Sequence, residues 1–232
     1  MVKAVKTIGL QRATLAGEVR GEIERMIVSG DLAAGEKLNE LSLSNAMGVS
    51  RGTVREAIRS LADSGLIDLI ANRGAFVHKT TLTEARNLYD LRGAIFAMAC
   101  AAAARRLREG LEARLIAQLE RNLDQMRSAY TTGDTTKYYA LNIEFHDMLL
   151  AASGNPKAKV TYDNLVREMH QFRRRGLSLV TNVAESIAEH EAITAAIASG
   201  DEDAARRAAF DHITGGFSRY MTLAEPQSNS DA

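Results

Sequence analysis

Residues 48–67, GVSRGTVREAIRSLADSGLI, decide how the first part of the chain folds. Apolar residues in this stretch share one helical face: Val54, Ile58 and Leu61. Arginines recur every four residues on another face: Arg51, Arg55 and Arg59. Both spacings are helical. Since Ser50 is a favourable N-cap and Gly65 stops a helix, we expect a helix from Arg51 to Ser64.

Two more helices are predicted upstream of this one. Apolar residues recur at helical spacing over residues 14–29, and Gly30 follows them as a C-terminal stop. A short helix over Glu40–Met47 then leads through a tight turn into the arginine helix. Downstream, LIDLI (66–70) and AFVHK (75–79) are separated by ANRG, which predicts a β-hairpin. Residues 1–80 therefore indicate a winged helix-turn-helix domain.

The pattern changes near residue 80, and helical periodicity then continues almost to residue 222. Thr83 is the expected N-cap of the first long helix in this part. Breaks at residues 110, 131–134, 153–156, 177–182 and 199–201 divide it into six helices, enough for an antiparallel bundle. The fold class is thus mainly α: an N-terminal winged helix-turn-helix (1–80), a C-terminal all-helical bundle (81–222) and a disordered polar tail (223–232).

Composition sets limits on where the protein acts. The 232 residues are 46% hydrophobic, which is enough for sizeable cores. Cys100 is the single cysteine and lies among small apolar residues, so we expect it to be buried and the chain to lack an internal disulfide, as in a reducing cytoplasm. The longest uncharged apolar run, 94–104, is too short to cross a membrane. Lysine plus arginine equals aspartate plus glutamate at 29 each, so only local charge can indicate an anionic partner.

The arginine helix and the hairpin together indicate binding to double-stranded DNA. The second helix of a helix-turn-helix enters the major groove, where an arginine can bind guanine through two hydrogen bonds. An arginine at the tip of the hairpin can enter the adjacent minor groove. The residues expected to contact DNA are Ser50, Arg51, Thr53, Arg55, Arg73 and Gly74. The alternative is that the arginines form a solvated face paired with Glu56 and Asp63.

Three of the five histidines can converge in the second part. His190 lies ten residues before Gly200 and His212 twelve after it, so both reach similar heights in a helical hairpin that turns there. If the helix that carries Asn142 and His146 packs against this hairpin, the four residues could hold a divalent metal. Otherwise His146 is a satisfied core residue. His78 and His170 match no ligand position.

Residues 35–77, GEKLNELSLSNAMGVSRGTVREAIRSLADSGLIDLIANRGAFV, resemble the winged-helix domain of GntR-family transcription regulators. By this resemblance Arg51, Arg55 and Gly74 match positions that contact operator DNA. Two positions depart from the family pattern: Gly52-Thr53 stands where a Thr-Pro pair is common, and Ala71 where a proline often precedes the wing turn. Because glycine is about 1 kcal/mol less favourable than alanine in a helix, Gly52 loosens the start of the recognition helix.

Residues 83–222 resemble the FCD effector domain of the FadR subfamily, in its shorter, VanR-like branch. Many such domains hold a metal with an aspartate, a histidine four residues later and two further histidines. His146, His190 and His212 fall on the histidine positions, and Asn142 falls on the aspartate position. The amide oxygen can coordinate a metal such as Zn or Ni but carries no charge. In the family an arginine near Arg92 often binds the carboxylate of the effector, and Asn142 could contact it as well.

We therefore expect a ligand-responsive transcription regulator, a repressor, that binds operator DNA as a homodimer and a small carboxylate effector in its C-terminal domain. For Arg92 the structural alternative is a salt bridge to Asp90 or Glu144. Two other functions stay open. One is a constitutive DNA binder whose second domain only dimerises, and the other is a metalloenzyme with a three-histidine site.

Overall fold

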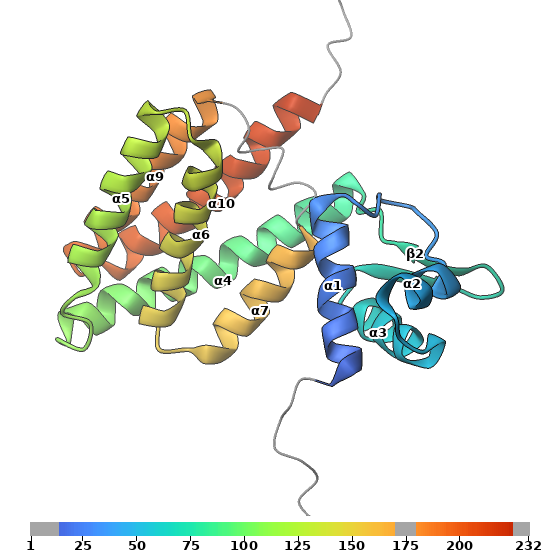
Figure 1. Cartoon of the computed structure of the whole chain (residues 1–232). Coiled ribbons are helices and arrows are strands. Elements are labelled where there is room, and N and C mark those ends of the chain that lie inside the picture. The colour runs from blue at the N-terminus through green and yellow to red at the C-terminus, as the bar shows by residue number, and fades with distance from the viewer. Residues whose placement is uncertain (1–13, 170–179, 225–232) are drawn as a thin grey trace, which may run out of the picture. The chain divides into compact units, whose positions relative to one another are not determined.

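The computed structural model describes residues 14–169 and 180–224. This part of the chain contains nine helices and one two-stranded sheet, as expected for a mainly α fold with a wing (Figure 1). The chain divides into two compact units between Lys79 and Thr80, next to the boundary expected near residue 80. None of the helices in the described ranges is both long and apolar enough to span a membrane.

The first unit is built on three helices: α1 (Leu15–Ser29), α2 (Glu40–Met47) and α3 (Arg51–Asp63). At the N-terminus of each helix, the side chain of the N-cap residue accepts a hydrogen bond from a backbone N–H group of the first turn. The three N-cap residues are Thr14, Asn39 and Ser50. Both α1 and α2 pack on α3, whose apolar face is fully buried as predicted. Helix α3 ends one residue before the expected Ser64, which is its C-cap.

The wing follows α3 and confirms the predicted hairpin. Strands β1 (Ile67–Ile70) and β2 (Gly74–Val77) pair antiparallel, with Ile70 opposite Gly74. Asn72 and Gly74 have positive φ angles of 60° and 104°, which close the tight turn. The segment before α2 also pairs with β2, through Leu38 N–H to Ala75 O at 2.9 Å.

The second unit contains six described helices, the number expected. They are α4 (Leu82–Arg108), α5 (Leu115–Thr131), α6 (Thr135–Ala152), α7 (Pro156–Glu168), α9 (Val180–Ala198) and α10 (Glu202–Ala224). The predicted N-cap Thr83 is wrong: Thr81 caps α4 because its hydroxyl accepts from Glu84 N–H while the Glu84 carboxylate accepts from Thr81 N–H. Helix α10 includes two residues of the predicted tail, and the rest of that tail lies outside the described residues.

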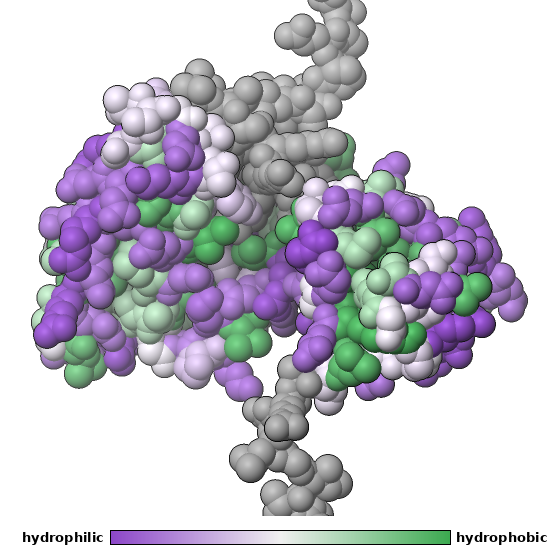
Figure 2. Space-filling model, viewed as in Figure 1, coloured by the Kyte–Doolittle hydropathy of each residue, from purple (hydrophilic) through white to green (hydrophobic). Residues whose placement is uncertain are grey.

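Helix α4 is the centre of the second unit. Helix α10 packs along α4 and α9, while α5 packs on α6 and α9. The alanine-rich middle of α4 is buried, including Cys100, and burial raises the pKa of its thiol. Gly200, with φ of 71°, makes the turn that sets α9 and α10 side by side. On the face in Figure 2, hydrophilic residues predominate at the surface of both units and hydrophobic residues form smaller areas.

Candidate DNA-binding surface and histidine site

The arginines of α3 lie at the surface of the first unit. Arg55 is half exposed and donates two hydrogen bonds to Glu40, from Nε to Oε1 at 3.0 Å and from Nη2 to Oε2 at 2.7 Å. Arg51 is 3.7 Å from the same carboxylate. The hydrogen bond from Arg55 lowers the pKa of Glu40, so this group is ionised at neutral pH. Glu40 on α2 therefore holds the two arginines, a role that Glu56 and Asp63, the partners named in the alternative interpretation, do not take in the described part of the chain.

The other predicted DNA contacts lie at the start of α3 and in the wing. Ser50 Oγ accepts from Thr53 N–H at 3.1 Å and lies 2.9 Å from its hydroxyl. Arg73 is in the turn between the strands, with its guanidinium 5.6 Å from the centre of the Phe76 ring. Gly74 brings the backbone to the surface beside Lys37. Basic side chains and exposed backbone thus meet at the wing.

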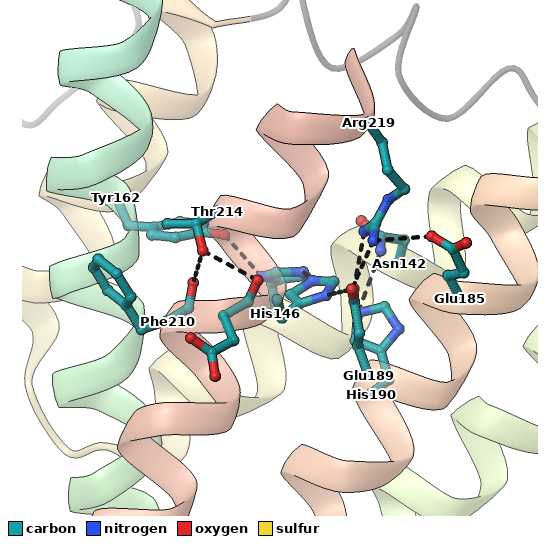
Figure 3. A network of polar contacts seen from close by, with 11 residues as sticks. Asn142, His146, Tyr162, Glu185, Glu189, His190, Phe210, Thr214 and Arg219 are labelled. Atoms are coloured by element: carbon teal, nitrogen blue, oxygen red, sulfur yellow. Dashed lines mark hydrogen bonds and ion pairs between the residues drawn. The ribbon is translucent and has the colours of Figure 1, made fainter. Parts of the chain in front are cut away.

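In the second unit His146, His190 and His212 come together from α6, α9 and α10, and all three are buried. Each offers a ring nitrogen within 4.8 Å of the other two. The closest pair is His146 Nε2 and His212 Nε2 at 3.2 Å. Figure 3 shows His146, His190 and Asn142 close together between the helices, and the rings of His146 and His190 are nearly perpendicular, at 85°. The predicted convergence of the α9–α10 hairpin on α6 is therefore present.

Asn142 lies one turn before His146 on α6 and is also buried. Its Nδ2 lies 3.4 Å from His190 Nε2, so coordination through the amide oxygen would need the amide to turn over. Burial lowers the pKa of His190 well below its ordinary value, and the ring is therefore neutral. Among the described residues, His190 Nδ1 has no hydrogen-bond partner.

His212 is held from its other side by Glu189 of α9, which forms an ion pair with Arg219 of α10. Figure 3 shows Glu189 and Arg219 beside each other. Its Nδ1 donates to Glu189 Oε2 at 2.7 Å, and Arg219 donates to both oxygens of Glu189 at 2.6 and 2.9 Å. Burial alone would raise the pKa of Glu189, but the hydrogen bonds from His212 and Arg219 bring it below its ordinary value. Burial likewise lowers the pKa of His212, against the effect of Glu189, so the ring is neutral.

His146 is held by Tyr162 of α7. The Tyr162 hydroxyl lies 2.8 Å from His146 Nδ1 and accepts a hydrogen bond from Arg92 Nε at 2.9 Å. Arg92, on α4, is 4% exposed and lies between two aromatic rings, with Cζ 5.1 Å from the centre of Tyr162 and 5.9 Å from that of Tyr89. His146 and His212 are thus connected to a buried cation through the hydroxyl of Tyr162.

The donor set fits a divalent metal. Two imidazole nitrogens bound to one zinc ion at 2.0–2.1 Å in tetrahedral geometry lie about 3.3 Å apart. The 3.2 Å between His146 Nε2 and His212 Nε2 is close to this value. Glu189 also fixes the tautomer of His212, because an ionised carboxylate only accepts, which leaves the lone pair on Nε2.

Comparison with known proteins gives the family. The family model "Bacterial regulatory proteins, gntR family" matches residues 15–77, and the FCD domain matches residues 87–215. The transcriptional repressor RspR of Escherichia coli K12 is 32% identical over 191 residues, which cover 82% of each chain. This chain belongs to the GntR family. A probable repressor of the D-xylose utilization operon in Paenarthrobacter nicotinovorans is 26% identical and covers 88% of each chain.

Solved structures agree on the fold of this GntR-family chain. Escherichia coli McbR/YncC matches with a TM-score of 0.71 at 20% identity, over 92% of this chain and all of that one. A GntR regulator from Rhodococcus sp. RHA1 matches with a TM-score of 0.68 at 21% identity, over 89% and 97% of the two chains. The family and the relatives are transcription regulators, so the chain is a DNA-binding regulator and not an enzyme.

Sequence reasoning missed four residues of these two sites in the GntR-family chain: Glu40, Tyr162, Glu189 and Arg219. Glu189 directly precedes His190, and this adjacency was the one available signal. The two remaining histidines, His78 and His170, were predicted not to be metal ligands. His78 is bonded to Asp68 at the base of the wing, at 2.9 Å, and His170 lies outside the described residues.

Proposed function

We propose that this GntR-family regulator is a repressor whose FCD domain binds a divalent metal and a small carboxylate, and that the carboxylate controls DNA binding. The metal ligands are His146, His190 and His212, with Asn142 as the fourth, and zinc or nickel suits three imidazoles. The carboxylate binds Arg92 and lies beside Asn142. When bound, the metal supplies positive charge and open coordination positions for an oxygen of the acid.

The observation that carries this proposal is the buried, uncompensated charge of Arg92. No carboxylate of the described residues 14–169 and 180–224 pairs with it, including the two candidates Asp90 and Glu144. A buried guanidinium without an anion is costly, and a bound carboxylate would compensate its charge through two parallel hydrogen bonds. The hydroxyl of Tyr162 separates this cation from His146 by two hydrogen bonds, so metal and acid would lie next to each other.

In the first unit, Arg51 and Arg55 are proposed to read base edges in the major groove from α3, with Ser50 and Thr53 at its start. Arg73 and Gly74 are proposed to approach the minor groove from the wing. A homodimer would present two such units to a pseudo-palindromic operator in the cytoplasm. Both relatives described above are named as repressors, which supports the sign of the effect.

Metal content is the first test. We expect about one zinc or nickel ion per chain in tag-free protein by elemental mass spectrometry, and loss of this ion in His190→Ala. His78→Ala is the matched control, since it removes an imidazole bonded to Asp68 in the wing. Absence of metal from the wild type, even after reloading, would refute the metal part of the proposal.

Release of DNA is the second test. Addition of a carboxylate effector should weaken operator binding in a gel-shift assay, and Arg92→Gln should retain operator binding without the response. If no acid from a broad panel changes operator affinity, the constitutive DNA binder with a dimerisation domain is the better explanation. Arg55→Ala should abolish specific binding under either explanation.

A further inference from the structure

The polar groups around the histidines form one continuous chain of hydrogen bonds across the second unit, which we call the relay (Figure 3). It runs through Arg92, Tyr162, His146, His212, Glu189 and Arg219, of which Figure 3 labels Tyr162, His146, Glu189 and Arg219. Its links measure 2.9, 2.8, 3.2, 2.7 and 2.6 Å in this order. The relay begins and ends on an arginine, but only the second of these, Arg219, is paired with a carboxylate in the described part of the chain.

The ionised end of the relay determines where each proton lies. Glu189 only accepts, so His212 carries its proton on Nδ1 and accepts at Nε2. His146 Nε2 faces that acceptor at 3.2 Å and must be the donor. With a neutral His146 ring, Nδ1 is then an acceptor, and the Tyr162 hydroxyl donates its only proton to it. In the metal-free relay, the hydroxyl proton of Tyr162 is therefore committed to His146.

Use of His146 Nε2 as a metal ligand reverses this arrangement. A ligating nitrogen offers its lone pair, so the ring proton of His146 must lie on Nδ1. Nδ1 then donates to the oxygen of Tyr162, which already accepts from Arg92 Nε. The hydroxyl proton of Tyr162 no longer faces an acceptor on His146 and turns to another oxygen.

We propose that Tyr162 makes carboxylate binding at Arg92 depend on the metal: its hydroxyl donates to His146 without metal and to the bound carboxylate with metal. This inference rests on the proposed metal and carboxylate sites. Tyr162 is thus a ligand-contacting residue that selects an acceptor oxygen next to Arg92. By linkage, the carboxylate should also strengthen metal binding through the same hydroxyl.

The position of Tyr162 supports this role. Its hydroxyl is 2.9 Å from Arg92 Nε, so an anion on the terminal nitrogens of Arg92 lies within reach of that hydroxyl.

Direct coordination of the carboxylate by the metal would also link the two affinities, but it would not involve Tyr162. Tyr162→Phe separates the two causes because it keeps the ring and removes the hydroxyl. Tyr89→Phe is the matched control, since its ring lies on the other side of Arg92 and its hydroxyl is not part of the relay.

The experiment is an NMR titration of the full-length protein with acetate, in metal-free and zinc-loaded form. When zinc is bound, Tyr162→Phe should bind acetate at least about tenfold more weakly than wild type, because one hydrogen bond to a charged group is lost; without zinc the two should bind acetate equally well. Tyr89→Phe should match wild type in both forms. Equal loss in both forms, or no loss with zinc, would overturn the inference.

Nitrogen-15 NMR of the histidine rings gives a second reading that needs no variant. The proton of His146 should lie on Nε2 in metal-free wild type and on Nδ1 after zinc is added. An unchanged tautomer in protein that binds zinc would overturn the inference and leave the proposed metal site standing. Failure of the wild type to bind zinc would overturn that site and the inference together.

Discussion

Replacement of Glu189 by glutamine tests how the site is held together. Glu189 accepts three short hydrogen bonds, from His212 Nδ1 at 2.7 Å and from Arg219 at 2.6 and 2.9 Å. Its side chain is 27% exposed and that of Arg219 16%, so solvent screens the pair only in part. With its oxygen in the place of Oε2, glutamine retains the bonds from His212 and from Arg219 Nη2, and its N–H₂ group then faces the Nη1 donor of Arg219. Because a hydrogen bond to a charged group contributes about 1.5–3 kcal/mol, we expect a net loss of about 2–4 kcal/mol.

Glu185→Gln is the matched control because it removes a carboxylate from the same helix and from the same arginine. Glu185 is 64% exposed and lies 3.4 Å from Arg219 Nη1, so its loss should cost about 0.5 kcal/mol or less. Urea unfolding at pH 7.5, followed by far-ultraviolet circular dichroism, compares the two variants. Both substitutions lie in the second unit, so the N-terminal unit contributes equally to the two unfolding curves. Equal unfolding midpoints in Glu189→Gln and Glu185→Gln would refute the reasoning.

Three further outcomes are expected. Glu40→Gln should bind random-sequence DNA more tightly, because Arg55 becomes available to a phosphate. The slope of the logarithm of the binding constant against the logarithm of salt concentration should become steeper by about 0.9. Fluorescence anisotropy across a salt series measures both. In metal-free protein, the free energy of unfolding should decrease as the pH is lowered below 6.5, by up to about 1.4 kcal/mol per pH unit for each of His190 and His212. Both have a lowered pKa, so the unfolded rings take up protons first; urea midpoints from pH 7.5 to 5.5 measure this. Asn142→Asp should bind zinc about tenfold more tightly or better, in competition with an indicator dye, and should bind acetate less tightly.

The winged helix was predictable almost residue by residue because its signals are local. Ser50, Gly65 and the apolar spacing of α3 lie within 16 residues of one another, and each acts through its own neighbours in the chain. The wrong N-cap predicted for α4 also comes from local signals, because two threonines there compete for the same position. Thr81 and Thr83 both suit an N-cap, and what decides between them is that Glu84 lies three residues after Thr81.

The histidine cluster was predictable for a different reason. A hairpin that turns at Gly200 has only one register, and it brings His190 and His212 to one height. The role of Tyr162, in contrast, could not be predicted from the sequence. It is buried with Leu165 on an amphipathic helix, at a spacing that any core tyrosine could have. Its contact with His146 depends on how α7 lies against α6 and on side-chain rotamers, and neither is encoded in local sequence.

The charges around the site explain why an amide at position 142 suits a sensor of anions. Glu189 compensates Arg219, and His190 and His212 are neutral because their pKa is lowered, so within the described residues Arg92 leaves one uncompensated positive charge before any metal binds. A divalent ion adds two more. An aspartate at position 142 would offset part of this charge from within the protein, whereas Asn142 offsets none. On the proposed function, the missing negative charge must then come from the ligand. Under this proposal, the amide holds the metal more weakly than an aspartate would and makes the site more dependent on a bound carboxylate.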